Sequence, residues 1–449
     1  MLAKERGDCK KEPTTDRLTG DFMLMRTRWV ISSVLLVTVC SFFVTGCFDG
    51  QELEEQAFLV TMGVDQVAPG TIALTARVAV PSKLTGSSGG GGGAGGGGDF
   101  QSGTPLVTAT GKTLHEALSM MNVGVERKIN LSHLSAILFS DKVARSGVLP
   151  YLRTLVRYRE FRRTLYVFVS KGSVSELFLK DKPVLETSAT RTIEDQHELS
   201  QTYGLAPSVQ IHEFINALET PHDDPIAPLW SLNEQVGKEK KKQSGSSKNL
   251  RGAIVSFTPG DINRTGGNPI ECVGTAVFRG DRMIGELSGD ETRYLQLLSG
   301  SLQQFILTLP SAKGGKNLVS LGIRNQQPMK VKILFRNGHP KLVITQAFEA
   351  ELLGDQSAMS FTLDSKHHTI EQVAAKIIQS KEAALITKMY KKMQTNPFHF
   401  FDAARNQFAT FQQYEAYPWH KQLKNVNLVV NTSVSLRRLG TQIAPLKAR

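Results

Sequence analysis

The chain has 449 residues, of which 40% are hydrophobic and 21% charged, and its formal net charge is +12. This is the composition of an ordinary globular protein, with enough material for two or three domains. Nucleic acid is excluded as a partner, because the chain has no base-reading motif and only 7% aromatic residues. The positive charge fits anionic lipid headgroups or a protein partner better.

An apolar run at 29–47, WVISSVLLVTVCSFFVTGC, follows Arg26 and Arg28. Small residues end the run, directly before a cysteine. We interpret it as a bacterial lipoprotein signal, whose lipobox is Val44, Thr45, Gly46 and the lipid-accepting Cys47. The alternative is an uncleaved transmembrane anchor with an incidental Cys47. However, roughly 16 apolar-rich residues are fewer than the roughly 20 that a bilayer span needs.

Residues 1–46 are therefore expected to be removed as a signal peptide. Their polar beginning is long for such a leader, and a start at Met23 or Met25 would give a short, basic one. The remaining chain then keeps a charge near +10, and Cys272 is its one thiol besides the lipidated one. This excludes disulfides and cysteine-based metal sites there, and the apolar neighbours of Cys272 predict a place in a buried strand.

Residues 47–220 are predicted to form an N-terminal mixed α/β domain. After an acidic helical start at 51–56, alternating apolar and polar residues predict a β-hairpin with strands at 57–64 and 71–80. Residues 85–98 are nearly all Gly and Ser. They predict a flexible surface insertion rather than a nucleotide-binding loop, because a strand and not a helix follows.

Strands and helices are predicted to alternate in the rest of this domain. Thr113 followed by Glu116 predicts a capping box at the start of a helix. The further elements are a strand at 106–110, the helix from 114, a strand at 134–140, helices at 141–147 and 148–157, a strand at 164–169, and helices at 174–179 and 209–218.

Five arginines lie within eleven residues near the end of one predicted helix: Arg153, Arg157, Arg159, Arg162 and Arg163. Arg153 and Arg157 share a helix face at spacing i, i+4. One interpretation is a basic patch that meets lipid headgroups or an acidic partner. The alternative is a solvated face whose charges pair with Glu160 and neighbouring acids.

Residues 221–268 are predicted to connect two domains, and their Lys-, Ser- and Gly-rich segment 238–248 to be a flexible loop. A C-terminal α+β domain follows at 269–440, with a tail at 441–449. Its predicted elements are a hairpin at 272–287, a capped helix at 288–300, strands at 305–309, 318–323, 331–335 and 341–352, a helix at 369–393 and a strand at 425–440. This pattern favours an antiparallel sheet with the long helix packed on one face.

No motif for a nucleophile, a nucleotide or a metal ion is present, and the ten histidines are scattered along the sequence. Two pairs of adjacent carboxylates, Asp223-Asp224 and Asp290-Glu291, are assigned to turns or helix starts, where capping and the helix dipole explain them. The sequence therefore predicts no catalytic residue, no metal and no cofactor, and a protein that is not an enzyme.

Several motifs, taken in order, resemble the Ger(x)C family of spore germination lipoproteins. They comprise Cys47-Phe48-Asp49, Glu52-Leu53, Gly63–Asp65, Gly111–Leu118, His133-Leu134, Ala144–Gly147, Arg157–Arg162, Gly274–Leu287, Glu291–Arg293, Pro418-Trp419 and Arg437–Gly440. The chain departs from the family at Phe48, where Trp is more usual, and between Asn396 and Asp402.

The resemblance implies a lipid-anchored, non-enzymatic C subunit of a nutrient germinant receptor. Such a subunit has a mixed α/β fold of several small domains and lies on the outer face of the spore inner membrane. Its partners are two integral-membrane receptor subunits, and the membrane lipid through Cys47. A solute-binding lipoprotein of a transporter is the alternative. That class needs two similar lobes of alternating strands and helices, and the predicted antiparallel C-terminal half argues against it.

Overall fold

The computed structural model describes residues 27–36, 38, 55–79, 105–184, 198, 202–234, 236, 257–262, 264, 266–310, 317–336, 339–356 and 364–439. Two units are distinguished, Met1–Glu55 and Gln56–Arg449. Within the first, residues 27–36 are helical and exposed. Among the helices described, none combines the length and the apolar character needed to cross a bilayer. The lipobox, the Gly-rich insertion and the 238–248 loop lie outside the described residues.

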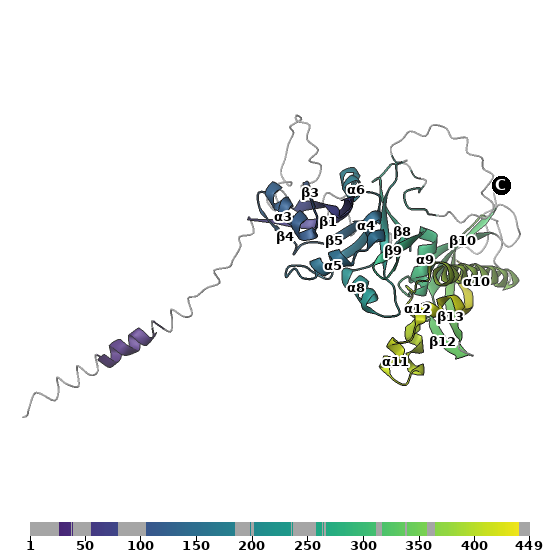
Figure 1. The fold of residues 1–449 in the computed structure, drawn as a ribbon. Helices are drawn as coiled ribbons and strands as arrows, with labels where there is room; N and C mark the ends of the chain where they lie inside the picture. The colour runs from purple at the N-terminus through teal and green to yellow at the C-terminus, as the bar shows by residue number, and fades with distance from the viewer. Residues whose placement is uncertain are drawn as a thin grey trace, which may run out of the picture. The chain divides into compact units, whose positions relative to one another are not determined.

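The second unit begins with a nine-stranded mixed sheet (Figure 1). Its order is β3-β2-β1-β5-β6-β7-β8-β9, with the short β4 also paired to β1. The strands are β1 (Gln56–Ala68), β2 (Thr71–Ala79), β3 (Leu106–Gly111), β4 (Lys128–Asn130), β5 (Ala136–Ser140), β6 (Tyr166–Lys171), β7 (Ile226–Leu232), β8 (Ile270–Arg279) and β9 (Arg282–Leu287). The central strands β1, β5, β6 and β7 run parallel, and both flanks are antiparallel.

Both faces of this sheet are covered, which explains why its central strands are apolar without alternation. In β5, Ile137 and Phe139 pack on one core cluster and Ala136 and Leu138 on the other. The first cluster includes α3 (Leu114–Gly124), α4 (Asp141–Ser146), α5 (Leu149–Leu155) and α8 (Ile211–Glu219). The second includes α6 (Val174–Lys180). The predicted β1–β2 hairpin and the buried position of Cys272 are confirmed.

Local capping agrees with the sequence prediction fully at one helix and in part at another. The Thr113 hydroxyl accepts a hydrogen bond from the Glu116 N–H at 3.1 Å. The Glu116 carboxylate accepts one in turn from the N–H of Lys112, not from that of Thr113 as a capping box requires. At α9 (Gly289–Leu298) both bonds of the box form between Ser288 and Glu291. Side chain-to-backbone bonds over three residues thus set where these helices begin.

One hairpin pairs across the predicted domain boundary. The hairpin of β8 and β9 was assigned to the C-terminal domain, but β8 pairs antiparallel with β7 and completes the first sheet. Trp230 of β7 and Cys272 of β8 are paired in register and share one core cluster. Residues 221–268 therefore contribute a central strand as well as a connection. The predicted division into separate folding domains stays a prediction.

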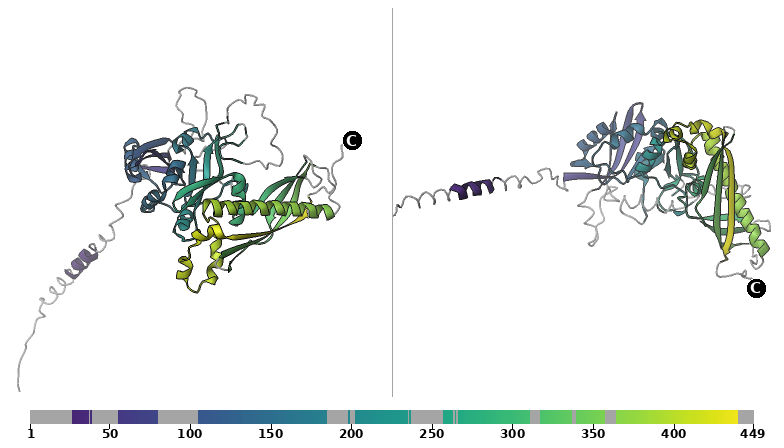
Figure 2. Two further views of the ribbon diagram at one scale, coloured as in Figure 1. Left: turned by 45° about the vertical axis from the view of Figure 1, so that its right-hand side comes forward. Right: turned by 90° about the horizontal axis from the view of Figure 1, so that it is seen from below.

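The second sheet has five strands, in the order β10-β11-β13-β12 with β14 beside β13. These are β10 (Gln304–Pro310), β11 (Leu318–Asn325), β12 (Lys330–Arg336), β13 (His339–Asp355) and β14 (Asn427–Arg438). The long helix α10 (Asp364–Thr387) packs on one face of the sheet (Figure 2). It ends in a π-helical turn, Lys388–Met393. The fold is thus mixed α+β, with the long helix on the C-terminal sheet as predicted.

The last strand departs from the predicted antiparallel sheet. β14 pairs parallel with β13 over residues 341–351. Helix α10 and the short helices after it separate the two strands in sequence, and such a crossover allows parallel pairing where a tight hairpin does not. The second sheet is therefore mixed, like the first.

A carboxyl group is buried between α10 and this sheet. Glu382 is fully buried, and its Oε2 accepts a hydrogen bond from Gln346 Nε2 at 2.7 Å, whereas Oε1 has no partner in the described structure. Burial raises the pKa of Glu382 from its ordinary 4.5 to about 7, against the effect of the Gln346 hydrogen bond. Between these two values the unfolded chain loses the proton and the folded chain keeps it. Stability therefore falls as the pH rises through this window.

Glu382→Gln is expected to raise the free energy of unfolding by about 3 kcal/mol above pH 7, because the amide is neutral at every pH. Below pH 4.5 the variant and the parent should be equally stable. Denaturant unfolding across this range measures both. The matched control is Glu415→Gln at an exposed site on α11 (Phe411–Glu415), which should leave the profile unchanged. If the free energies of unfolding of Glu382→Gln and the parent ran parallel across this pH range, the raised pKa of Glu382 would be contradicted.

Candidate functional site

Two adjacent aspartates join the first sheet to the C-terminal elements. They lie in the loop between α8 and β7, and we call them and their partners the Asp223–Asp224 junction. Asp223 Oδ2 lies 2.7 Å from His399 Nδ1, and Asp224 Oδ2 lies 2.9 Å from His420 Nε2. Asp224 also accepts hydrogen bonds from the N–H groups of Gly280 and Asn396, at 3.0 and 2.9 Å. The two carboxylates therefore fasten three separate segments together.

The surroundings shift the pKa values of the residues at the junction in different directions. Burial acts to raise the pKa of Asp224, but the hydrogen bond and charge of His420, with the two N–H groups, hold that pKa below its ordinary value. The hydrogen bond to Asp223 raises the pKa of His399, although burial opposes it. Burial lowers the pKa of His222 despite its bond to a carbonyl. Asp224 therefore stays ionised and His222 stays neutral near pH 7.

His222 is the buried centre of an aromatic cluster. Its Nε2 lies 2.8 Å from the carbonyl oxygen of Tyr414, and its ring makes edge contacts with Phe401 and Tyr414. Phe401 also packs against Trp419. The segment before this cluster is strained, since the non-glycine residue His399 has a φ of 55°. The hydrogen bond to Asp223 holds His399 in that conformation.

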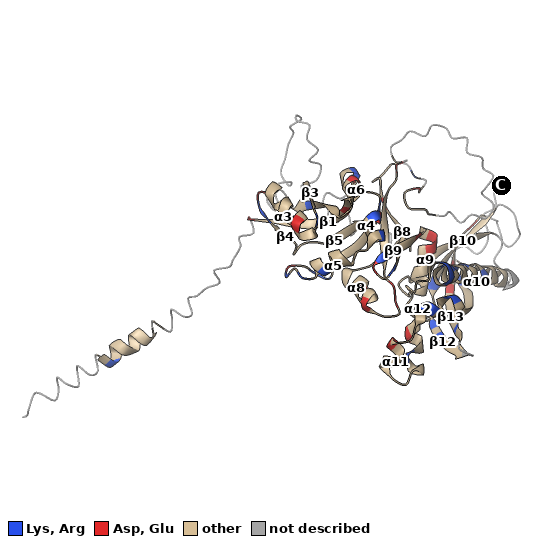
Figure 3. Cartoon of the chain, viewed as in Figure 1, with Lys and Arg blue, Asp and Glu red and all other residues tan. Residues whose placement is uncertain are grey.

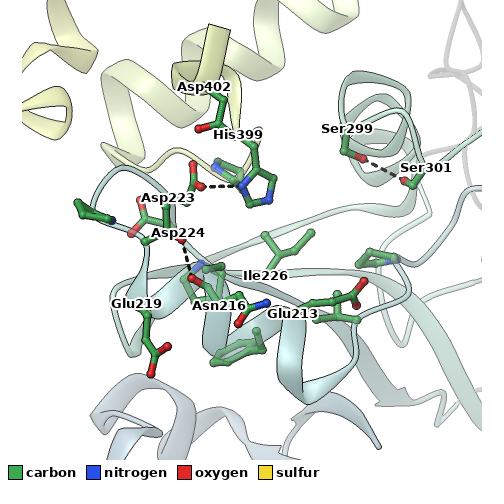
Figure 4. Close-up of a pocket in the computed structure, with 18 of the residues that line it drawn as sticks. Glu213, Asn216, Glu219, Asp223, Asp224, Ile226, Ser299, Ser301, His399 and Asp402 are labelled. Carbon is green, nitrogen blue, oxygen red and sulfur yellow. Dashed lines mark hydrogen bonds and ion pairs between the residues drawn. The ribbon is translucent and has the colours of Figure 1, made fainter. Parts of the chain in front are cut away.

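A cavity of about 970 Å³ opens beside the junction (Figure 4). Its lining residues come from α8, the end of α9, α11 and the 3₁₀ helix Phe400–Gln407. The ionisable residues among them are Glu213, Glu219, Asp223, Asp224, His399, Asp402, Arg405 and Glu415. Carboxylates predominate, so the cavity favours positively charged or hydrogen-bond-donating groups over anions.

Several of these carboxylates already serve the fold. Glu213 Oε2 accepts from the N–H of Gln210 at 2.7 Å and closes the cap of α8. Asp402 accepts from the Tyr414 hydroxyl at 2.7 Å. Within the described part of the chain, no group of three or more His, Cys, Asp or Glu side chains is arranged to hold a metal ion. The contacts that the structure assigns to these acids are positioning contacts between elements.

The predicted basic cluster lies on the surface. Arg153 belongs to α5, the other four arginines follow it, and all five are exposed. Figure 3 marks the basic positions along the chain in blue. Arg153 and Arg157 border a hollow of about 440 Å³ whose other lining residues are His115, Thr154 and Tyr158. Among the described residues, Glu160 and the other carboxylates form no ion pair with these arginines. The charge pairing expected under the alternative interpretation is therefore absent from this part of the structure.

The structure changes the interpretation of one carboxylate pair and extends that of the other. Asp223 and Asp224 were assigned to a turn or a helix start, but their oxygens bind residues far along the chain. Asp290 and Glu291 do begin α9. They also bind Lys381 of α10 at 3.1 Å and Lys388 of the following π-helical turn at 2.6 Å, respectively. The sequence HDDP directly before an apolar strand was the available sign of a buried junction. Cys47 and its lipobox lie outside the described residues.

Two family models match successive parts of the chain. The "Spore germination protein N-terminal domain" matches residues 49–232, and "Spore germination B3/GerAC like, C-terminal" matches residues 273–440. Among curated Bacillus subtilis proteins, the putative spore germination protein YfkR is 24% identical, over 92% of this chain and 97% of that protein. Spore germination protein B3 is 20% identical, over 93% of this chain and 99% of that protein.

One further relative and one solved structure are also similar to this chain. Spore germination protein KC of Bacillus subtilis is 22% identical, over 90% of this chain and 94% of that protein. The crystal structure of the GerBC protein is similar over 86% of this chain and 99% of that chain, at 17% identity and a TM-score of 0.48. The two matched segments follow each other and together cover most of the sequence after Cys47. The protein therefore belongs to the Ger(x)C family of spore germination proteins.

Proposed function

We propose that this protein is a lipid-anchored, non-enzymatic subunit of a spore nutrient germinant receptor. Cys47 carries the lipid and holds the folded unit on the outer face of the spore inner membrane. Two integral-membrane subunits are its partners. Its role is to complete the receptor, so that spores respond to a nutrient.

One observation carries the proposal: the family match begins at Asp49, two residues after the lipobox cysteine. The proposed leader and lipid-accepting cysteine therefore lie directly before the matched germination domain. The contacts of the Asp223–Asp224 junction agree with a scaffolding role, since its acids and histidines are held by structural hydrogen bonds.

The test is to purify the tagged chain from detergent-solubilised spore membranes. Two multi-pass membrane proteins are expected to copurify with it. Spores that lack the chain should fail to germinate with one class of nutrient, yet germinate normally with calcium dipicolinate, which bypasses nutrient receptors. Copurification of an ATPase and a permease instead would contradict the proposal and indicate a transporter. Unchanged nutrient germination would also contradict it.

A further inference from the structure

We propose that the basic surface around α5 binds the phosphate groups of anionic lipids in the membrane that carries the protein. This inference rests on the proposed lipid anchor and adds a second, non-covalent contact. The basic face is defined as Arg153, Arg157, Arg159, Arg162 and Arg163, together with the hollow that the first two border.

The hollow has the side chains that a phosphate group requires. Arg153 and Arg157 line it with His115, Thr154 and Tyr158. The Tyr158 hydroxyl lies 2.5 Å from His115 Nδ1, so these two polar groups are held side by side. Guanidinium groups bind phosphate oxygens through paired, charge-assisted hydrogen bonds. The hollow thus combines two guanidinium groups with hydroxyl and imidazole groups.

The charge of this face is not balanced locally. Residues 153–163 contain five arginines and a single acid, Glu160. In the described part of the chain these arginines have no carboxylate within ion-pairing distance. The nearby Glu116 on α3 is engaged by the N–H of Lys112 at 2.8 Å. An unbalanced positive face of this kind is attracted to an anionic membrane surface.

Helix α3 connects this face to the point where the lipid tether enters the fold. Its first turn carries His115, and its Asn122 Oδ1 accepts from the N–H of Ile129 in β4 at 2.9 Å. β4 in turn pairs with the start of β1, with Lys128 opposite Gln56. One helix of about 16 Å therefore separates the tether entry from the basic face.

Covalent geometry then keeps this end of the fold close to the lipid. Cys47 precedes Gln56 by nine residues, which span about 30 Å at most when fully extended. Two apolar side chains on α3 face solvent, Met120 at 51% exposure and Val123 at 83%. The proposed anchor at Cys47 brings a bilayer within this reach, and five exposed arginines without ion pairs among the described residues favour its anionic headgroups, so the bilayer is the occupant of the basic face.

The test uses the mature lipidated chain in vesicles of phosphatidylcholine alone or with equal phosphatidylglycerol. Hydrogen exchange of residues 114–124 and 149–163 is measured by mass spectrometry. Exchange is expected to slow only in the phosphatidylglycerol vesicles, and to recover at high salt. Each surface arginine contributes a factor of about five to the membrane affinity, and a glutamate in its place adds repulsion, so Arg153→Glu with Arg157→Glu should weaken the vesicle affinity by at least roughly 30-fold and abolish the protection.

The matched control is Lys421→Glu with Lys424→Glu, which makes the same charge change at two exposed C-terminal sites and should preserve the protection. A second pair, Arg159→Glu with Arg162→Glu, covers the case in which the first variant fails to fold. Equal protection in both vesicle types, or the same protection from inorganic phosphate with phosphatidylcholine, would overturn the proposal. Protection that needs the receptor partners would overturn it too, in favour of an acidic protein. The intact mass of the sample shows, independently of the exchange data, whether the chain carries its acyl group.

Discussion

Replacing Cys47 with Ala is expected to abolish the incorporation of labelled fatty acid and to shift the protein from the membrane fraction to the soluble fraction of spores. Each acyl CH₂ buried in a bilayer contributes about 0.8 kcal/mol, and two chains give stable anchoring where one gives only reversible binding. What stays in the variant is an apolar run of roughly 16 residues, shorter than a bilayer span. Fractionation with immunoblotting and label counting measures both effects.

Cys40→Ala is the matched control for this experiment. It makes the same chemical change seven residues earlier, inside the leader that is expected to be removed. Label and membrane retention should be unchanged. A parent protein that keeps residues 1–46 in the spore and carries no acyl group would contradict the lipoprotein interpretation. That result would instead support the uncleaved anchor.

Features that depend on neighbours in the sequence were predictable. The Ser288 and Glu291 capping box involves residues three positions apart, so both partners are visible in one short segment. The same holds for the five clustered arginines, which needed no fold to be recognised as a basic surface. Strand and helix patterns of apolar residues likewise gave most of the longer described elements in the right order, because each records which faces are buried. They did not give β4, β7 or the short helices between residues 400 and 425.

Pairing between distant segments was not predictable in the same way. β8 is mostly apolar and would fit any buried sheet, so its sequence does not reveal that it joins β7 rather than the C-terminal strands. β14 has the alternation of a half-buried strand, and that pattern is the same in parallel and antiparallel pairs. In both cases the composition of the strand determines its burial but not its neighbour.

The Asp223–Asp224 junction was missed for a related reason. His399 lies 176 residues after Asp223, and His420 lies 196 residues after Asp224. Scattered histidines and a pair of adjacent acids in a polar link have ordinary solvent-exposed explanations when seen singly. Only the fold brings them together, and only burial makes their hydrogen bonds necessary.

Asn396→Ala is expected to lower the free energy of unfolding by about 4 kcal/mol, because the side chain is fully buried and satisfies three polar groups. Its Nδ2 donates to the His222 carbonyl at 2.8 Å and to Asp223 Oδ1 at 3.3 Å. Its Oδ1 accepts from the buried Tyr390 hydroxyl at 2.9 Å. Truncation leaves all three without this partner inside the protein, and each such loss costs about 1–3 kcal/mol. Denaturant unfolding measures the change.

Two comparisons separate this network from a simple loss of volume. Asn406→Ala makes the same truncation at an exposed site in the 3₁₀ helix Phe400–Gln407, and should change stability by less than about 0.5 kcal/mol. Tyr390→Phe removes the hydroxyl that Asn396→Ala leaves without its hydrogen-bond partner. Combined with Asn396→Ala, it should therefore cost less than the sum of the two single changes. Strict additivity, or an Asn396→Ala loss as small as that of Asn406→Ala, would contradict the role of Asn396. A non-additive result would establish that Asn396 and Tyr390 act through one shared buried hydrogen bond, to which the bonds from Asn396 to His222 and Asp223 connect the loop before β7.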